Sequence, residues 1–411
     1  MEHKELLPHL FRTEYQKLVS VLCSLFGIQH VETAEDIVSD TFLSATENWS
    51  HHGLPNNPTA WLYTVAKNKT KNHLKRHTLF QQKLSPELQR EGATGHEIEV
   101  DLSVKNISDS QLAMIFAVCD PVNPSEAQIA LALNLLCGFG AQEIADAFLT
   151  NKEVIYKRIN RAKDKLRETN VRIAQPSTKE IGSRLDTVLT TLYLLFSEGY
   201  YSVSQNTTLR KEFCIEAMRL TYLLIQNATT NNPKVNALMS LMCFHASRFD
   251  ARINDKGEAI LYHEQNESLW NQELIQRGKY FLNNSAAGTN LSKYHLEAGI
   301  AYWHTQKEDT TEKWQSILEL YDSLLALEHS PVAALNRAYV VSKTSGKEAA
   351  ITEAEKLKLV NDHFYFSLLG NLYTELDNGR AIQYYEKAIS LTNSVAEQTM
   401  IRKKIEDIGL L

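Results

Sequence analysis

The stretch from Ala141 to Arg167, AQEIADAFLTNKEVIYKRINRAKDKLR, limits the possible folds of this chain more than any other stretch. It predicts two short helices joined by a tight turn. In the first helix, Ile144, Ala145 and Phe148 have the i, i+1, i+4 spacing of a single apolar face.

The second helix of this stretch is predicted to begin after Asn151, whose side-chain oxygen can accept a hydrogen bond from a free first-turn amide. Its apolar residues recur at spacings of four, three and four, and they are Ile155, Ile159, Ala162 and Leu166. The other faces are mostly basic and carry Lys152, Tyr156, Lys157, Arg158, Arg161 and Lys165. A buried stripe opposite a basic surface, after a tight turn, is what a helix needs to read the major groove of DNA. Taken alone, the stretch is equally compatible with an ordinary helical hairpin that has a solvated basic face.

The composition places the chain among soluble globular proteins. With 411 residues it is long enough for two to four domains, and 43% of its residues are hydrophobic. Its mean hydropathy is −0.31. No apolar run approaches the ~18 residues of a membrane span, and no secretory signal opens the chain. The five cysteines lie far apart without a CxxC pair, which favours reduced thiols in a cytoplasmic protein.

The net charge of −6 argues against a nucleic-acid binder, but the charge distribution argues for one. Residues 59–78 hold five basic side chains and no acidic one, and residues 152–172 are again strongly basic. Between them, residues 86–110 are acidic. Two local basic patches joined by an acidic tether are better suited to binding a polyanion than the average charge suggests.

Three amphipathic helices are predicted before the tether, at about 10–26, 33–49 and 58–77. The second has a cap-like start at Thr33 and Asp36, and Ile37, Thr41, Ala45 and Trp49 can face a core. Asn57 followed by Pro58 is a helix-start signal. The third helix begins with apolar residues and ends with basic ones, a mixture that suits contact with phosphates and stacking on bases. A pair of histidines before it, His51 and His52, has no partner at metal-ligand spacing.

The runs AEDIVSDTFLSATENW and NPTAWLYTVAKNKTKNHLKR resemble region 2 of the extracytoplasmic-function (ECF) group of bacterial RNA polymerase sigma factors. The resemblance implies that the second helix docks on the β′ clamp helices of core polymerase. It also implies that the third helix and the preceding loop open and capture the −10 promoter element. By position, the polymerase-facing residues would be Asp36, Ile37, Asp40 and Phe42. The residues facing the −10 DNA would be Asn56, Trp61, Lys67, Asn68, Asn72, Lys75 and Arg76.

Residues 125–166 resemble sigma region 4, which reads the −35 element and contacts the β flap. This chain has Leu149 where the turn usually carries glycine, and Tyr156 at the place of the usual lysine. The resemblance assigns the −35 contact to the exposed residues early in the second helix of the opening stretch, namely Lys152, Glu153, Tyr156, Lys157, Arg158 and Arg161. The order of region 2, acidic tether and region 4 is more specific than either unit.

More than half of the chain follows Arg172, and it predicts further amphipathic helices. From about Leu291 a pattern repeats in which a small or polar residue precedes a tyrosine by three positions. The pairs are Gly299 with Tyr302, Asn336 with Tyr339, and Gly370 with Tyr373. The last unit resembles a tetratricopeptide (TPR) repeat, whose period is about 34 residues. Stacked hairpins of this kind offer a curved surface to a peptide or protein partner, or serve only as a packing module.

The sequence therefore predicts an all-α, multidomain chain with region 2 at 1–80, an acidic linker at 81–110 and region 4 at 111–172. A helical domain at 173–290 and TPR-like repeats at 291–411 would follow. The resemblance implies a cytoplasmic ECF-type sigma factor, with core RNA polymerase and promoter DNA as partners and the C-terminal half as regulator. No catalytic motif is present, and we expect no enzyme activity, cofactor, metal or membrane contact. The alternatives are a helix-turn-helix regulator with a TPR-like interaction scaffold, and a scaffold protein whose sigma-like half is inactive.

Overall fold

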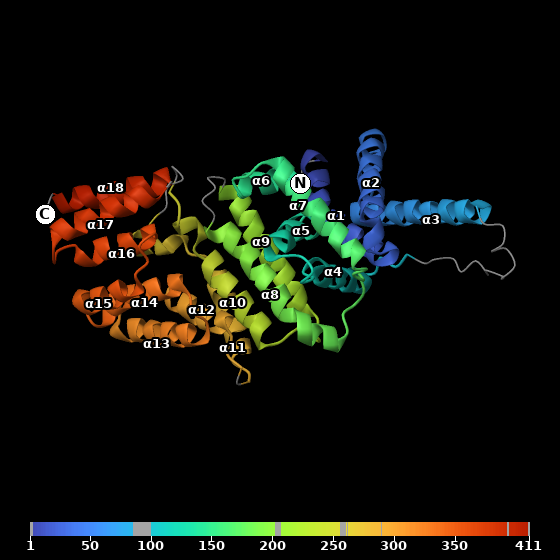
Figure 1. The fold of residues 1–411 in the computed structure, drawn as a ribbon. Coiled ribbons are helices and arrows are strands. Elements are labelled where there is room, and N and C mark those ends of the chain that lie inside the picture. Colours follow the sequence, from blue (N-terminus) through green and yellow to red (C-terminus); the bar gives the residue numbers. More distant parts are fainter. Residues whose placement is uncertain are drawn as a thin grey trace. The chain divides into compact units, whose positions relative to one another are not determined.

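The computed structural model describes residues 3–84, 100–201, 207–254, 260, 262–288, 290–392 and 394–409, and every element assigned in them is helical (Figure 1). The all-α prediction is therefore confirmed. The chain divides into two compact units, Met1–Thr230 and Asn231–Leu411. Regions 2 and 4 of the sequence interpretation lie in the first unit, together with the beginning of the C-terminal half. Within the described ranges, no helix has both the length and the apolar character that crossing a membrane requires.

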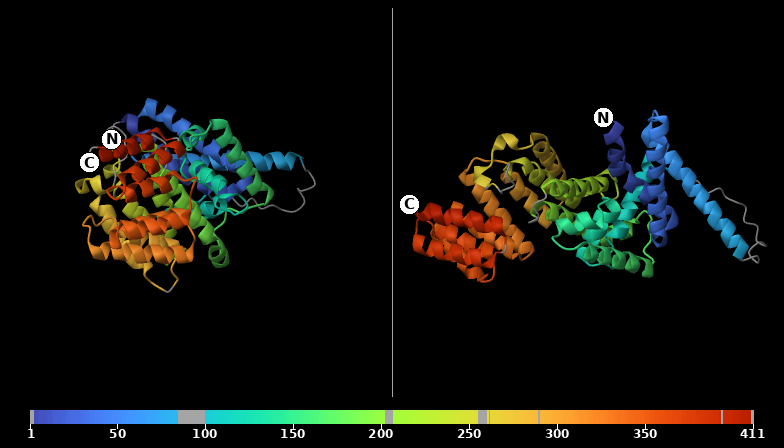
Figure 2. Two further views of the ribbon diagram at one scale, coloured as in Figure 1. Left: turned by 60° about the vertical axis from the view of Figure 1, so that its left-hand side comes forward. Right: turned by 90° about the horizontal axis from the view of Figure 1, so that it is seen from above.

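The first unit opens with α1 (His3–Phe26), α2 (Val31–His52) and α3 (Pro58–Leu84). The predicted core positions of α2 are buried, and they are Ile37, Thr41, Ala45 and Trp49. In its first half α3 buries a narrow stripe at four-residue spacing, which consists of Leu62, Ala66 and Thr70. Beyond this stripe α3 projects away from α1 and α2 (Figure 2).

Two of the predicted helix starts can be compared with the structure. Asn57 caps α3 as predicted, because its side-chain oxygen accepts a hydrogen bond of 3.0 Å from the amide of Ala60. The predicted start of α2 at Thr33 is wrong. The helix begins at Val31, directly after a 3-10 turn, and no side chain caps it. Val31 and Ala34 are fully buried, so apolar packing rather than a polar cap fixes this end of the helix.

The second group of helices comprises α4 (Val104–Val118), α5 (Ser125–Leu131), α6 (Ala141–Ala147) and α7 (Lys152–Glu168). A π-helical turn, Ala132–Leu136, continues α5. The last two helices are the predicted hairpin. Helix α4 is buried on nearly all sides because α1, α8, α9 and the π-helical turn pack around it. The acidic tether falls mostly on residues 85–99, which lie outside the described residues.

Two helices that follow Arg172, α8 (Thr178–Tyr201) and α9 (Thr207–Gln226), complete this unit. Arg184 of α8 donates a hydrogen bond to the carbonyl oxygen of Phe116 and forms an ion pair of 2.9 Å with Asp120. Arg219 of α9 donates a hydrogen bond of 2.9 Å to the carbonyl oxygen of Leu136. The start of the C-terminal half is thus part of the same core as α4 and α5.

The second unit contains nine described α-helices. They are α10 (Pro233–Ala246), α11 (Gln272–Ser285), α12 (Lys293–Trp303), α13 (Thr311–Leu327), α14 (Pro331–Thr344), α15 (Lys347–Leu357), α16 (His363–Tyr373), α17 (Asn378–Leu391) and α18 (Val395–Gly409). From α12 to α17 they form three successive hairpins whose first helices carry the repeated pattern. A Cβ at Gly370 would lie 2.8 Å from the ring of Tyr385, and one at Gly299 would lie 3.1 Å from Leu320. Glycine therefore permits the close approach of paired helices at both positions.

Candidate nucleic-acid interface

Helix α3 presents a polar and basic face opposite its buried stripe. Trp61, Asn68, Asn72 and Lys75 fall on one side of the helix at 100° per residue, with Lys67 and Arg76 on its two flanks. Asn68, Asn72, Lys75 and Arg76 are exposed, while Lys67 and Trp61 are half-buried. The predicted −10 residues of α3 therefore form one continuous surface.

The loop before α3 brings the remaining predicted −10 residue close to this face. Asn56 is exposed in the loop, four residues after the end of α2. The ring of Trp61 meets the ring of buried Trp49 edge to face, with centroids 5.4 Å apart. Edge-to-face aromatic pairs stabilise by about 0.5–1.5 kcal/mol beyond the burial of their area, so this contact ties the end of α2 to the start of α3 across the loop.

A short segment after the tether lies against the first half of α3. Residues 100–103 and the α3 residues Ala60, Tyr63, Thr64 and Lys67 line a shallow cavity of about 400 Å³. Val100 is only 2% exposed. The hydroxyl of Tyr63 donates a hydrogen bond of 2.6 Å to Glu14, and burial together with this bond raises the pKa of Tyr63. Since Val100 is buried and residues 100–103 share this cavity with Lys67, the end of the tether lies beside Lys67, at the edge of the predicted −10 surface.

Helix α7 has the predicted amphipathic arrangement. Its four stripe residues are all buried, from 0% exposed for Ile155 and Leu166 to 5% for Ile159. Asn151 caps the helix by accepting a hydrogen bond of 2.9 Å from the amide of Val154. Most of the predicted −35 residues are exposed, and these are Lys152, Glu153, Tyr156, Lys157 and Arg161. Arg158 is half-buried and forms an ion pair of 3.1 Å with Glu126.

The turn between α6 and α7 is made by a residue with an unusual backbone conformation. Leu149 has φ = 49°, which lies in the left-handed region that favours glycine. Its side chain is 65% exposed, so it gains little from burial. The tight turn between the two helices is therefore formed at this position without glycine, at a local cost of about 1 kcal/mol.

The four predicted polymerase-facing residues divide into two groups. Asp36 and Asp40 are exposed, and Asp40 forms an ion pair of 2.5 Å with Lys69 of α3. Ile37 is 8% exposed and Phe42 is 5% exposed. In this structure the carboxylates are on the surface, whereas the two apolar side chains belong to the core of the α1–α3 bundle.

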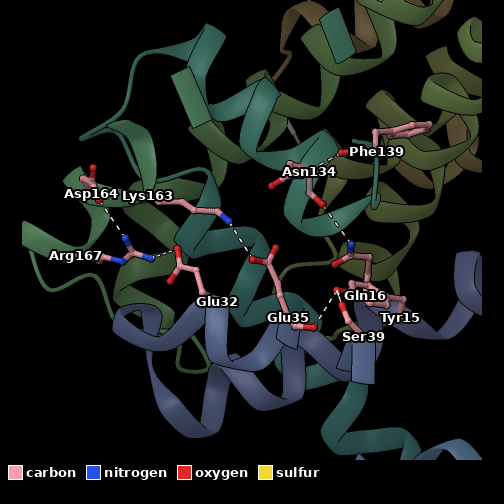
Figure 3. A network of polar contacts seen from close by, with 10 residues as sticks. All are labelled: Tyr15, Gln16, Glu32, Glu35, Ser39, Asn134, Phe139, Lys163, Asp164 and Arg167. Atoms are coloured by element: carbon pink, nitrogen blue, oxygen red, sulfur yellow. Dashed lines mark hydrogen bonds and ion pairs between the residues drawn. The ribbon is translucent and has the colours of Figure 1, made fainter. Parts of the chain in front are cut away.

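One edge of the C-terminal half of α7 faces α2, and side-chain ion pairs join the two helices (Figure 3). Lys163 is 7% exposed, and its ammonium group forms an ion pair of 3.2 Å with Glu35. Arg167 forms a second ion pair with Glu32 and a third of 3.1 Å with Asp164 of its own helix. Gln29 donates a hydrogen bond of 3.0 Å to the carbonyl oxygen of Arg167. We call this set of contacts the α2–α7 contact.

The electrostatics of the α2–α7 contact agree with its geometry. Burial alone would raise the pKa of Glu32, but the hydrogen bond and charge of Arg167 outweigh it, and the pKa is lowered. Burial would likewise lower the pKa of Arg167, and Glu32 with Asp164 raises it instead. Both groups are therefore held in their charged forms.

Sequence reasoning did not identify the residues of the α2–α7 contact as a site. A weak signal existed, because Glu32 and Glu35 are three residues apart and Lys163 and Arg167 are four apart, so each pair lies on one helix face. A second contact, between the α1–α3 helices and the α4–α7 helices, is a hydrogen bond of 3.3 Å from the side-chain amide of Gln16 in α1 to the carbonyl oxygen of Asn134. The side-chain amide of Asn134 donates in turn to the carbonyl oxygen of Phe139, as Figure 3 shows.

Comparison with known proteins finds two families within the chain. Residues 10–79 match the family described as Sigma-70 region 2, and residues 184–286 match a family of unknown function (DUF6596). Uncharacterized protein R00370 of Rhizobium meliloti (strain 1021) is 30% identical over 389 residues, which cover 93% of this chain and 91% of that protein. RNA polymerase sigma factor YlaC of Bacillus subtilis (strain 168) is 30% identical over 81 residues, or 20% of this chain and 46% of YlaC. No solved structure has significant similarity to the chain.

Proposed function

Because residues 10–79 match sigma-70 region 2, and because the chain shares nearly its whole length with protein R00370, we propose that it is an ECF-type RNA polymerase sigma factor of the sigma-70 family. Residues 1–80 would bind core polymerase and open the −10 element. Residues 111–172 would read the −35 element. The C-terminal half would regulate the complex, and its three hairpins would act as TPR-like repeats that hold a peptide or protein partner. Such a subunit has no catalytic role of its own, and we place it in the cytoplasm with the polymerase.

One observation carries this proposal. Two separate helices, α3 and α7, each combine a buried stripe with an exposed basic face, and most of the first lies within residues 10–79, which match sigma-70 region 2. Exposed cations on a rigid helix bind phosphates, and neighbouring polar and aromatic side chains can contact bases. Two such faces in one chain are suited to a DNA with two recognition elements.

The test is run-off transcription with core RNA polymerase and the DNA upstream of the chain's own gene. We expect Lys75→Glu combined with Arg76→Glu to lower transcription at least 100-fold, because two phosphate contacts become repulsive. Binding to core polymerase, measured by native gel or light scattering, should stay within twofold. The matched control is Lys105→Glu combined with Lys179→Glu, which reverses two exposed lysines of α4 and α8.

Unchanged transcription by the Lys75/Arg76 variant would contradict the assignment of the −10 surface. A helix-turn-helix regulator remains the second candidate, since the outer face of α7 is exposed and could bind duplex DNA without polymerase. Specific binding of promoter DNA by the free protein, together with no transcription on any of several DNAs, would favour that candidate.

A further inference from the structure

A cluster of polar and aromatic side chains in the second unit surrounds the ring of Tyr262. Arg248 follows α10, and its guanidinium carbon lies 5.5 Å from the centroid of that ring. The ring of Trp270 stacks on it at 6.3 Å, and the ring of His304, directly after α12, meets it edge to face at 5.1 Å. Trp314 of α13 extends the group, since its ring lies 6.2 Å from that of His304. We call these five residues the Tyr262 cluster.

Four of the five side chains hold a buried polar atom that has no hydrogen-bond partner among the described residues. The atoms are Nε of Arg248, Nε1 of Trp270, Nε1 of Trp314 and Nδ1 of His304. Arg248 is 8% exposed, Trp270 is 4% exposed and Trp314 is 5% exposed. Buried polar atoms in folded proteins are nearly always paired, because an unmade hydrogen bond costs free energy. Several unpaired atoms in one place indicate a group that the chain does not itself supply.

Most of these unpaired atoms are hydrogen-bond donors. Nε of Arg248 and the indole nitrogens of Trp270 and Trp314 each carry a hydrogen and cannot accept. Burial lowers the pKa of His304, so its ring is neutral near neutral pH and its Nδ1 can donate or accept. The side-chain oxygen of Gln265 is also unpaired, and its backbone amide donates to the carbonyl oxygen of Tyr262 at 3.3 Å. The donors fit an acceptor-rich group, and the glutamine oxygen fits a hydroxyl on the same ligand.

The charges around the Tyr262 cluster are mostly positive. Of the described residues, no carboxylate forms an ion pair with Arg248. The ammonium groups of Lys313 and Lys343 lie 5.1 and 5.6 Å from the ring centroid of Trp314, and they share the carboxylate of Asp309 at 3.4 and 3.8 Å. Lys313 keeps its hydrogen bonds within the chain, so it supplies charge rather than a free donor. Three cations with one carboxylate leave a net positive charge, which favours an anion in a partly dehydrated site.

We propose that the Tyr262 cluster binds a small oxyanion, a phosphate or a carboxylate, with Arg248 as the charged anchor and the indole N–H groups of Trp270 and Trp314 as neutral donors. Arg248, Tyr262 and Trp270 belong to the stretch that matches the family of unknown function, whereas His304 and Trp314 belong to the first hairpin of the repeats. The bound anion therefore ties these two parts of the second unit together. This inference goes beyond the proposed sigma function and does not depend on it.

The test is binding of two probes to the full-length protein, inorganic phosphate and glycolate, which is a carboxylate with a hydroxyl. Tryptophan fluorescence and isothermal titration calorimetry both report on it. We expect one-to-one binding of at least one probe, about tenfold tighter than the binding of chloride. The tighter probe identifies the class of oxyanion. If neither probe saturates, or if chloride binds as well as both, water or an adventitious ion only fills the cluster and the proposal is overturned.

Arg248→Gln is the central variant, since it removes the charge and keeps a polar side chain. We expect it to weaken binding of the tighter probe by about tenfold. In buffer free of phosphate and carboxylate, its urea midpoint should be no lower than that of the starting protein, because an unpaired buried charge is gone. Adding the probe should raise the midpoint of the starting protein and not that of the variant. An arginine with a purely structural role would give a lower midpoint and unchanged affinity, which would overturn the assignment.

Two further variants serve as matched controls and as a safeguard against misfolding. Arg277→Gln removes an exposed arginine of α11 from the same unit and should leave the affinity for the probe unchanged. Trp314→Phe keeps an aromatic ring and removes only the N–H donor, so we expect calorimetry to show binding weakened by about threefold. Its control is Trp303→Phe, at a half-buried position of α12 outside the cluster. Equal affinities of Trp314→Phe and Trp303→Phe would overturn the proposal even if Arg248→Gln does not fold.

Discussion

The two units each bury a lysine, and the two lysines are held in different ways. In the first unit, Lys163 of α7 is 7% exposed and its ammonium group has one described ion-pair partner, Glu35, at 3.2 Å. That partner lies 128 residues away in sequence and keeps 28% of its side chain exposed. If the two helices separate, both charges can return to water.

In the second unit, Lys313 of α13 is 0% exposed and has several partners. Its ammonium group donates hydrogen bonds to the carbonyl oxygen of Gln306 at 2.6 Å and to the hydroxyl of Tyr262 at 3.1 Å. It also lies over the rings of Tyr262 and Trp314 and 3.4 Å from Asp309. Burial lowers the pKa of Lys313 even though Asp309 acts in the opposite direction.

The comparison distinguishes a lysine that belongs to a fixed, packed region from a lysine whose ion pair can break when two helices separate. The partners of Lys313 are mostly neutral groups fixed in the same packed region, so the lysine stem fills space and its amine completes a local network. The partner of Lys163 is a lone carboxylate on another helix, and an ion pair of that kind adds little to stability when one side is hydrated. Lys163 is therefore suited to hold two helices together reversibly, and Lys313 is not.

The largest effect is expected from truncating Lys313. Lys313→Ala removes buried methylene groups and leaves a cavity beside Tyr262 and Trp314, at a cost of about 3 kcal/mol in the free energy of unfolding. Lys313→Met, which keeps most of the stem and loses the charge, should recover at least half of that loss. Urea unfolding of the full-length protein measures both. A Met variant as unstable as the Ala variant would show that the charge, not the packing, is what matters.

The second expected effect is on the pH dependence of stability, and it comes from His304, which lies next to the residues around Lys313. Burial, together with the charges of Arg248 and Lys313, lowers the pKa of His304 to about 3. Between pH 6.5 and 3 the unfolded chain therefore binds a proton that the folded chain does not. Stability should fall as the pH drops below 6.5, by about 1.4 kcal/mol per pH unit from this residue.

The measurement for His304 is the slope of unfolding free energy against pH between 6 and 4.5. His245, whose pKa burial also lowers, contributes to the starting slope, so the informative quantity is the change on substitution. His304→Gln should reduce the slope by about 1 kcal/mol per pH unit. The control His263→Gln changes a histidine whose side chain is 73% exposed and should leave the slope as it is. If His304→Gln has the same slope of unfolding free energy against pH as His263→Gln, His304 does not cause the fall in stability at low pH.

A smaller effect on stability is expected at the α2–α7 contact. Lys163→Met should lower the unfolding free energy by about 1 kcal/mol or less, because Glu35 can be hydrated once its partner is gone. Urea unfolding of the full-length protein measures the change. A loss of stability as large as that of Lys313→Ala would erase the distinction between the two lysines.

The parts of the fold that follow local rules could be predicted from the sequence. The stripe of α7 and the caps at Asn151 and Asn57 depend only on residues within one or two turns, and the structure has them as predicted. The start of α2 could not be predicted in the same way. Its position depends on Val31 and Ala34 being buried by other helices, which overrides the polar signal at Thr33.

The α2–α7 contact was beyond sequence reasoning for a related reason. Glu35 belonged to an acidic group that would ordinarily be read as solvated, and Lys163 was one basic residue among many in α7. Nothing local distinguishes a charge that meets water from one that meets an opposite charge 128 residues away. The two helices are brought together by the packing of α1 on α4 and of α7 on the 3-10 turn that precedes α2, and that packing is a property of the whole unit.

The smallest expected effect tests whether the two faces of α7 act separately. Arg161 is exposed on the outer face, so Arg161→Ala should weaken binding to promoter duplex about threefold to fivefold and reduce the slope of log affinity against log salt by about one. The unfolding free energy should stay the same, since Arg161 takes no part in the α2–α7 contact as described. Lys163→Met should do the reverse, lowering the unfolding free energy slightly while leaving the salt slope of duplex binding intact. Such a reciprocal result would establish that one helix uses its outer face for DNA and its inner face for packing within the unit. If both substitutions change both quantities, the two faces of α7 do not act separately.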